Sequence, residues 1–193
     1  MSRHTDVVPD IYRKAVIATA RESSRGWRGV ASSTDGTKLA AVAFGAQLYT
    51  STDSGVNWTP RESVRNWYSV ASSSDGVKLV AVERGGLIYT STDSGVSWTP
   101  RESIRGWRVV ASSADGTRLA AGTETADLLY TSTDSGVSWT PRDSARNWRG
   151  LAFSADGAKL VATANGGQIY TSGVYTAAAA GQPKHQRHPA IHG

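Results

Sequence analysis

The sequence contains no cysteine, a single methionine and only two phenylalanines among its 193 residues. The absence of cysteine excludes a disulfide scaffold, thiolate metal ligands and a thiol nucleophile. No apolar run approaches the roughly 18 residues needed to cross a membrane. The apolar segment Ala15–Ala20 is too short for the core of a secretory signal peptide. The sequence therefore predicts a soluble protein without membrane contact, and it leaves the cellular compartment open.

Turn-forming residues are abundant instead. The chain has 20 glycines together with many serines and threonines, and seven Trp and seven Tyr supply most of its large side chains. Such a composition indicates many tight turns. No uninterrupted window reaches the roughly 10–12 residues that an amphipathic helix requires. We therefore predict an all-β fold.

The chain repeats itself. Trp27, Trp67, Trp107 and Trp148 mark successive copies and lie 40, 40 and 41 residues apart. A period near 40 is typical of helical-pair repeats and of four-stranded propeller blades. An Asp-Gly dipeptide, which favours hairpins, follows a short β-type run in every copy, at 35–36, 75–76, 115–116 and 156–157. This turn chemistry favours blades.

The second copy shows the expected strands most clearly. We predict strands at Trp67–Ser73, Lys78–Glu83, Leu87–Ser91 and Val96–Arg101. The second of these is apolar on both alternating sets of positions, as in a sheet buried on both faces. Pro100 lies in the fourth strand, and the donor that it lacks confines that strand to a sheet edge. Four such antiparallel strands describe a propeller blade.

The predicted organisation has three parts. Residues 1–15 form an N-terminal lead, residues 16–172 form the β-propeller repeats, and residues 173–193 form a disordered, compositionally biased C-terminal tail. Four blades are expected near 27–62, 67–101, 107–142 and 148–172. His185, His188 and His192 fall in the tail without carboxylate support, so we expect solvated histidines, no metal site and no cofactor.

The two ends of the array are incomplete in complementary ways. Val16–Arg21 aligns with the fourth strand of a blade, and the last copy lacks that strand after Ser172. An N-terminal strand at 16–21 would complete the last blade and remove an open edge. A local strand at Val174–Thr176 is the alternative. Four blades either close as a small ring or form half of a larger ring completed by a second chain, so a homo-oligomer is an open alternative.

A motif of the form Ser-x-Asp-x-Gly-x-x-Trp recurs between the third and fourth strands. It resembles the Asp-box, the bacterial-neuraminidase repeat of sialidase-type propellers. The fuller repeat is similar to those of photosystem II assembly-factor-like propellers, and the resemblance covers about residues 16–172. The motif residues are Ser51, Asp53, Gly55, Trp58, Ser91, Asp93, Gly95, Trp98, Ser132, Asp134, Gly136 and Trp139.

We expect these motifs to be structural. Each aspartate can accept backbone N–H bonds across its own turn, each glycine supplies a positive φ, and each tryptophan packs against the blade. One carboxylate in each copy offers too few oxygen ligands for calcium.

The sialidase resemblance implies an arginine cluster, a Tyr/Glu nucleophile pair and an acidic catalyst. This sequence lacks the Arg-Ile-Pro motif of those enzymes, and its copies are nearly identical. A catalytic site needs unlike groups that converge on one atom. Glu62 and Glu102, the carboxylates available for glycoside hydrolysis, each stand beside an arginine, which indicates a solvated ion pair.

Charge divides the predicted disc into two faces. The segments that link one blade to the next, at 21–28, 61–68, 101–108 and 142–149, carry net charges of +2, +1, +2 and +2. We expect Arg25, Arg65, Arg105 and Arg146 to form a ring on this face, accompanied by Tyr68 and Arg108. Arginines beside aromatic rings suit carboxylated or sulfated sugars, or phosphate. In the alternative, they are solubilising arginines paired with Glu22, Glu62, Glu102 and Asp143.

The sequence favours a non-catalytic binding or assembly scaffold, because repeated equivalent surfaces provide multivalency. Its partner would be an anionic or carbohydrate ligand or another protein. Nucleic acid is not expected, because no continuous basic stripe is present. Two alternatives are a sialidase-type glycoside hydrolase and a structural repeat fragment without a function of its own.

Overall fold

The computed structural model describes residues 19–172. All regular structure in this part of the chain is β-strand, so it holds no helix that could span a membrane. The strands are β1 (Trp27–Ser32), β2 (Leu39–Ser51), β3 (Thr59–Ser72), β4 (Leu79–Ser91), β5 (Thr99–Ser112), β6 (Leu119–Thr123), β7 (Asp127–Ser132), β8 (Thr140–Arg146), β9 (Trp148–Phe153), β10 (Leu160–Ala164) and β11 (Ile169–Ser172). The prediction of an all-β protein is confirmed.

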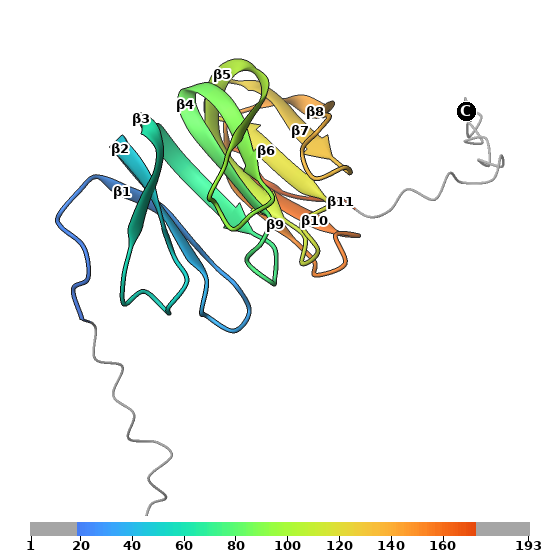
Figure 1. Ribbon diagram of the computed structural model, residues 1–193. Helices are drawn as coiled ribbons and strands as arrows, with labels where there is room; N and C mark the ends of the chain where they lie inside the picture. Colours follow the sequence, from blue (N-terminus) through green and yellow to red (C-terminus); the bar gives the residue numbers. More distant parts are fainter. Residues whose placement is uncertain (1–18, 173–193) are drawn as a thin grey trace, which may run out of the picture.

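The strands form one eight-stranded sheet in the order β1 to β8 and one three-stranded sheet in the order β11-β10-β9 (Figure 1). Every pairing is antiparallel. The long strands change partner halfway along their length. In β4, for example, Leu79–Glu83 pair with β3 and Arg84–Thr90 pair with β5.

The strand boundaries differ from those expected. Apart from Lys78, the predicted strands at Lys78–Glu83 and Leu87–Ser91 both lie in β4, with a tight turn at Gly85, whose φ is +74°. Of the predicted edge strand at Val96–Arg101, only Thr99–Arg101 form a strand, and they continue through the link to the next repeat as β5. They do so because Arg105, within the link, pairs with Gly86 of the turn in β4.

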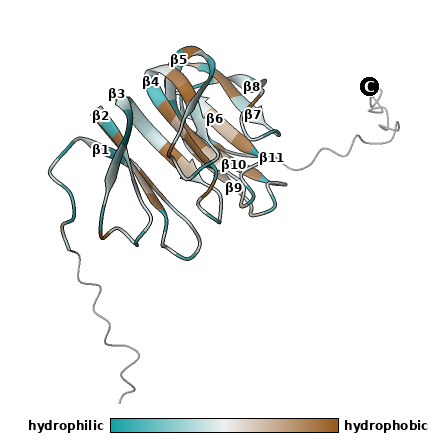
Figure 2. Ribbon diagram, in the orientation of Figure 1, coloured by the Kyte–Doolittle hydropathy of each residue, from teal (hydrophilic) through white to brown (hydrophobic). Residues whose placement is uncertain are grey.

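The hydrophobic core lies at the junctions between successive repeats (Figure 2). At each junction, apolar residues from the middle strands of one repeat surround the first tryptophan of the next repeat. Val80, Val82 and Ile88 of the second repeat thus form one buried cluster with Trp107 and Val110 of the third. Trp67 and Trp148 hold the same place in the other two clusters.

Backbone hydrogen bonds reinforce these junctions. Thr34 donates its N–H to the carbonyl oxygen of Ser74 at 2.7 Å, and Ser74 donates to Ala114 at 2.7 Å. Ala114 donates in turn to Ala155 at 2.9 Å. One hydrogen bond of the same kind therefore links each Asp-Gly turn to the next, across all three junctions.

The expected closure by residues 16–21 of the same chain is not what the structure shows. β1 and β11 lie at opposite ends of the array, and the sheets do not close (Figure 1). Residues 19–21 belong to no strand. Residues 16–18, the alternative strand at 174–176, the lead and the tail lie outside the described residues.

Candidate functional site

Hydrogen bonds define two faces of the array. On one, which we call the connector face, the links between repeats lie beside the turns near residues 44–46, 84–86, 124–126 and 165–167. Phe44 donates its N–H to the carbonyl oxygen of Gly26 at 2.9 Å, and Glu124 donates to Gly106 at 2.8 Å. On the other, the turn face, the Asp-Gly turns contact the Ser-Thr-Asp turns at 51–58, 91–98 and 132–139, as in the 2.9 Å bond from Ser94 N–H to Val77 O.

The Ser-Thr-Asp turns use their carboxylates internally. Ser91 Oγ donates to Asp93 Oδ1 at 2.8 Å and accepts the N–H of Gly95 at 2.9 Å. Asp93 also accepts the N–H of Ser97 at 2.9 Å, while Trp98 Nε1 donates to the Gly95 carbonyl oxygen at 3.1 Å. The turns at Asp53 and Asp134 repeat this arrangement.

These hydrogen bonds stabilise the ionised carboxylates. The Ser97 hydroxyl and backbone N–H lower the pKa of Asp93 from 3.8 to about 2. The same two donors at Ser138 lower the pKa of Asp134 to about 2, and the N–H and side-chain amide of Asn57 do so for Asp53. Among the Asp-Gly turns, the hydroxyl of Ser33 and the N–H of Thr37 lower the pKa of Asp35 to about 2.

The aspartates of the Asp-Gly turns are engaged in the same way. The carboxylates of Asp75, Asp115 and Asp156 also have lowered pKa values, each caused first by the serine hydroxyl two residues earlier. Within residues 19–172, no group of three or more His, Cys, Asp or Glu side chains is placed to hold a metal ion.

On the connector face, each predicted ring arginine stacks on a tyrosine of its own repeat. Arg65 lies 4.8 Å from the centre of the Tyr89 ring, and Tyr89 meets Trp67 edge-on at 5.0 Å. The other repeats contain the same stack in Arg25, Tyr49 and Trp27, in Arg105, Tyr130 and Trp107, and in Arg146, Tyr170 and Trp148.

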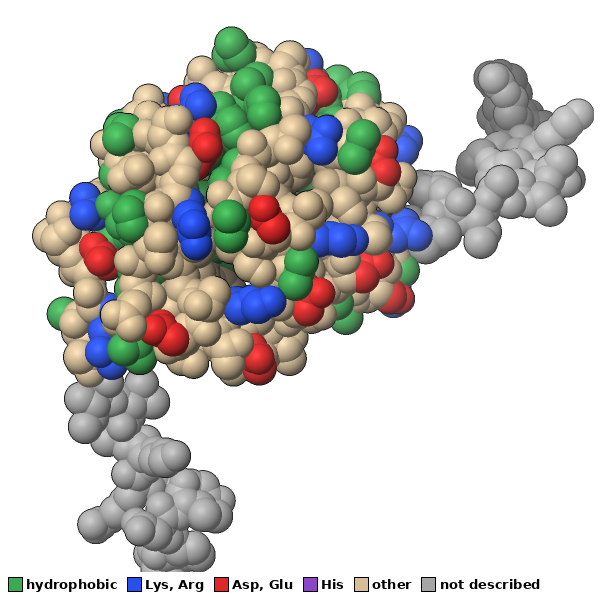
Figure 3. Space-filling model, in the orientation of Figure 1, with side chains coloured by type: hydrophobic (Ala, Val, Ile, Leu, Met, Phe, Trp, Pro, Cys, Tyr) green, Lys and Arg blue, Asp and Glu red, His purple; other side chains and the backbone are tan. Residues whose placement is uncertain are grey.

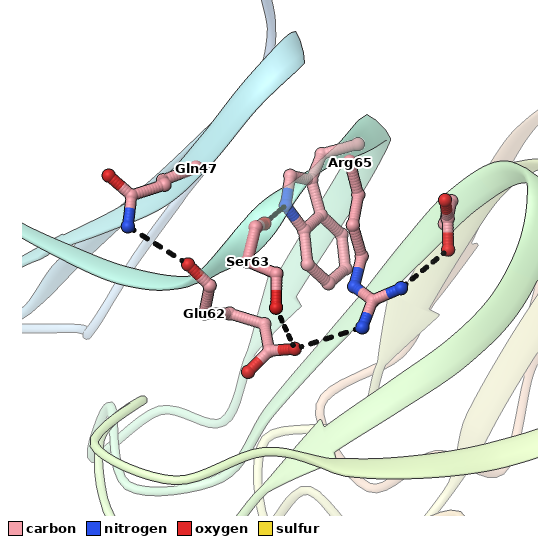
Figure 4. A network of polar contacts seen from close by, with 6 residues as sticks. Gln47, Glu62, Ser63 and Arg65 are labelled. Carbon is pink, nitrogen blue, oxygen red and sulfur yellow. Dashed lines mark hydrogen bonds and ion pairs between the residues drawn. The ribbon is translucent and has the colours of Figure 1, made fainter.

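The same arginines are ion-paired. Arg65 lies 3.3 Å from Glu62 and 3.5 Å from Glu83, and Glu62 in turn accepts a hydrogen bond from Gln47 through its backbone carbonyl (Figure 4). Arg105 lies 3.7 Å from Glu102 and 2.9 Å from Asp127.

The remaining two ring arginines follow the same pattern, because Arg25 pairs with Glu22 at 3.7 Å and Arg146 with Asp143 at 2.9 Å. About 30% of the Arg65 and Arg105 side chains remains exposed. Each of the four arginines predicted to form a ring is thus held against a tyrosine and paired with at least one carboxylate.

A second set of basic residues crosses the junctions. The Tyr68 ring lies between two guanidinium groups, with Arg28 of the first repeat at 5.5 Å and Arg108 of the third at 4.9 Å from its centre. Arg108 also lies 3.2 Å from Glu124, which pairs with Arg84 as well. The sequence analysis selected Tyr68 and Arg108 as candidate binding residues but not Arg28. The signal was present, because the three occupy the same repeat position.

Ion pairing leaves some of this charge uncompensated. Neither Arg28 nor Arg149, which occupies the same position in the fourth repeat, has an ion-pair partner within residues 19–172. Figure 3 shows basic and acidic side chains interspersed over one face of the molecule. Arg61, Arg101 and Arg142 of the same links also lack an ion-pair partner within residues 19–172, so the uncompensated positive charge of the connector face is shared between these two repeat positions.

A cleft of about 740 Å³ lies between the third and fourth repeats. Leu129, Trp148, Leu160 and Tyr170 contribute to its walls. At the two earlier junctions, Trp98 and Trp139 pack against the corresponding core clusters, whereas the fourth repeat has no equivalent tryptophan. The only carboxylate among the described residues that line the cleft is Asp143.

No family model and no curated protein matches this chain. Among solved structures, a GH74 enzyme from Niastella koreensis is similar with 26% identity and a TM-score of 0.60, over 76% of this chain and 22% of that one. YCF48 bound to a D1 peptide is similar with 21% identity and a TM-score of 0.60, over 78% of this chain and 52% of that one.

The computationally designed Ika4 protein is similar with a TM-score of 0.63 at 9% identity, over 80% of this chain and 94% of that one. The GH74 and YCF48 proteins are β-propellers, so this chain shares a propeller type of fold. It spans about a fifth of the length of the GH74 enzyme and about half that of YCF48.

Proposed function

We propose that the chain is an array of four Asp-box propeller blades that serves as a non-catalytic binding scaffold, and that its connector face binds an acidic segment of another protein. The observation that carries the proposal is the Tyr68 ring between Arg28 and Arg108, because three successive repeats contribute one side chain each to a single row.

The blade assignment is supported by the pairing pattern. The strands β3 and β5 change partner where one predicted blade ends and the next begins, as β5 does between Arg105, which pairs with β4, and Trp107, which pairs with β6. The Asp-box assignment is supported by the three equivalent turns, in which a buried serine, the aspartate and the tryptophan make the same hydrogen bonds.

A carboxylate-bearing ligand suits this row for physical reasons. A guanidinium group that stacks on an aromatic ring keeps its N–H edge directed away from the ring, where it can form two parallel bonds to a carboxylate. An extended chain rises about 3.3 Å per residue, so an acidic peptide can follow a row that spans several repeats. YCF48, which shares the fold, has a structure bound to a peptide.

Glycoside hydrolysis is the second candidate, and the similarity to the Niastella koreensis enzyme favours it. Such hydrolysis requires a carboxylic acid that stays protonated near neutral pH. Among the described carboxyls whose pKa departs clearly from its ordinary value, all are lowered, including Glu124 and Asp143 on the connector face. Incubation with xyloglucan and with a fluorogenic sialoside tests this candidate, and we expect no turnover above a boiled control.

The binding proposal is tested by fluorescence anisotropy with a labelled oligoglutamate peptide at low and physiological salt. We expect Arg28→Gln and Arg108→Gln each to weaken binding at least about tenfold, the effect of losing roughly 1.4 kcal/mol. Lys38→Gln, which removes one positive charge from the turn face, is the matched control and should bind like the unaltered protein.

Three outcomes distinguish the alternatives. Equal loss in the Lys38→Gln control would mean that binding follows net charge and not this row. Preference for a sulfated or sialylated oligosaccharide over the peptide would move the ligand class to glycans. Absence of binding to either probe would favour the structural repeat fragment.

A further inference from the structure

The two ends of the array expose residues that are buried at every internal junction. Leu48, Ile88 and Leu129 occupy one repeat position, and they are 0%, 0% and 6% exposed because the next repeat covers them. Ile169 occupies that position in the fourth repeat and is 73% exposed. The neighbouring Val161 is 38% exposed, whereas its equivalent Val80 is 1% exposed.

The first repeat exposes the other half of the same contact. Trp67, Trp107 and Trp148 are all 0% exposed within the clusters that the preceding repeat completes, whereas Trp27 is 36% exposed. Val30 is 77% exposed, while its equivalents Val70 and Val110 are each 6% exposed. One end thus offers aliphatic side chains without a tryptophan, and the other offers the tryptophan without them.

The polar contacts of the junction are divided between the ends in the same way. Ala155 holds a position that donates an N–H at each internal junction, yet no backbone acceptor for that N–H occurs among residues 19–172. At each internal junction the residue equivalent to Thr34 accepts this bond through its backbone carbonyl. The carbonyl of Thr34 itself receives no such bond within residues 19–172. The donor of the junction is therefore available at one end and the acceptor at the other.

Side-chain packing agrees. A Cβ atom added to Gly76 would lie 2.7 Å from Cβ of Lys38, and one added to Gly116 would lie 2.8 Å from Cβ of Lys78, since each lysine covers the turn of the next repeat. Gly36 has no neighbour within 4 Å of such an atom. Lys159 is the lysine of the last repeat, and no glycine turn within residues 19–172 lies against it.

We propose that a second copy of this chain completes the junction, with β9–β11 of one copy packed on β1 and β2 of the other. Ile169 and Val161 then cover Trp27 and Val30 of the second copy, and Ala155 N–H reaches its Thr34 carbonyl. The hydrophobic contact, the backbone hydrogen bond and the lysine-covered glycine turn of this interface are the same as those at the three internal junctions of the chain.

The contact joins two different surfaces, one at each end of the array. Each copy in an open pair therefore keeps one end uncovered until a ring closes. Two copies related by a two-fold axis satisfy both halves at once and form a ring of eight repeats. The open arrangement of β1 and β11 in a single copy leaves this solution available (Figure 1). The inference is independent of ligand binding at Arg28, Tyr68 and Arg108, because it concerns the two ends of the array.

Light scattering after size exclusion, together with sedimentation velocity over a range of concentrations, tests the proposal with the full chain. We expect the mass of two copies for the unaltered protein. Val30→Asp and Ile169→Asp should each be monomeric, because a charge would then be buried in both junctions of the ring. Both positions are more than two-thirds exposed in the single copy, so circular dichroism should show folded monomers.

The decisive experiment mixes the two monomeric variants. The Val30→Asp variant keeps the unaltered Ile169 end, and the Ile169→Asp variant keeps the unaltered Val30 end. The mixture should therefore form a species of two copies through the one junction between these two unaltered ends. Val137→Asp is the matched control, because Val137 is 62% exposed on the turn face away from both ends, and it should leave the mass unchanged.

Several results would overturn the proposal. One is a strictly monomeric unaltered protein at all concentrations, as expected if residues 1–18 or 173–193 cover the ends instead. Another is failure of the mixture to associate, which would point to a contact between two like ends. Masses that keep increasing beyond two copies would replace the ring with an open chain.

Discussion

Ser74 donates its backbone N–H to the carbonyl oxygen of Ala114 across 2.7 Å, although the two residues lie in turns of different repeats. The equivalent bonds at Thr34 and Ala114 place every pair of neighbouring turns in the same relation. Because the junction is repeated, a substitution at one position can be compared with the same substitution at another whose surroundings differ in a known way.

Substitutions at Ile88 and Ile169 compare the same side chain inside a junction and outside one, and so measure how much the junction contributes to stability. Ile88 is fully buried against the next repeat, whereas Ile169 is 73% exposed. We expect Ile88→Ala to lower the free energy of unfolding by about 2–5 kcal/mol, through lost burial and a cavity. Ile169→Ala should change it by less than about 0.5 kcal/mol in urea titrations at a concentration where the protein is monomeric. Similar losses at both positions would contradict the packing described above.

Ser91 and Ser97 separate a buried from an exposed contact in one turn. Ser91→Ala leaves the buried N–H of Gly95 without its acceptor, which costs about 1–3 kcal/mol. Ser97→Ala removes only an exposed hydroxyl bond to Asp93 and should cost about 0.5 kcal/mol or less. Urea unfolding monitored by tryptophan fluorescence compares the two. The structural role of the turn would be refuted if Ser97→Ala were the more damaging change.

The aspartates of the Ser-Thr-Asp turns predict sensitivity to acid. Asp53, Asp93 and Asp134 have pKa values lowered from 3.8 to about 2 in the folded chain. A lowered folded pKa means that the carboxylate stabilises the fold above the unfolded pKa, and that this contribution is lost as pH falls towards the folded value. The free energy of unfolding should therefore decrease between about pH 4 and pH 2.

Urea titrations at several pH values measure this decrease. In the triple variant D53N/D93N/D134N the dependence should be flatter over the same interval, because those three groups no longer titrate. An unchanged slope would assign the acid sensitivity to other carboxyls, such as Asp35, whose pKa is also lowered to about 2.

Gly85 and Gly95 both have positive φ values, +74° and +82°, but different surroundings. Alanine at Gly85 meets nothing within 4 Å and should cost only the left-handed backbone strain of about 1–2 kcal/mol. Alanine at Gly95 would also place its Cβ 2.7 Å from Cγ2 of Thr50. We expect at least about 1 kcal/mol of additional loss there from overpacking. Thermal and urea unfolding of the two variants provide the comparison.

Much of the local structure could be predicted from the sequence because it depends on residues close in the chain. The hydrogen bonds of the Ser-Thr-Asp turns join residues two to four positions apart, so Ser91, Asp93 and Gly95 together define the turn. Strand ends were less predictable. The link after Arg101 looked like a connection, yet it pairs with the preceding turn and extends β5 to Ser112.

The connector face shows where prediction from sequence ended. The pairing of Arg65 with Glu62, three residues away, is visible in the sequence. Its second partner Glu83 and the pairing of Arg84 with Glu124 join different segments, and only the tertiary structure brings them together. These pairs decide which arginines remain free of an acidic partner.

By itself the sequence determined the repeat, the turn chemistry and the all-β class, because each of these is encoded within about one repeat. Only the tertiary structure decided that four repeats stay open, that Trp27 and Ile169 lie uncovered at opposite ends, and that Tyr68 stands between two arginines. The physical reason is that these properties depend on how each repeat is stacked and rotated on its neighbour. That arrangement is determined by contacts between residues about 40 positions apart.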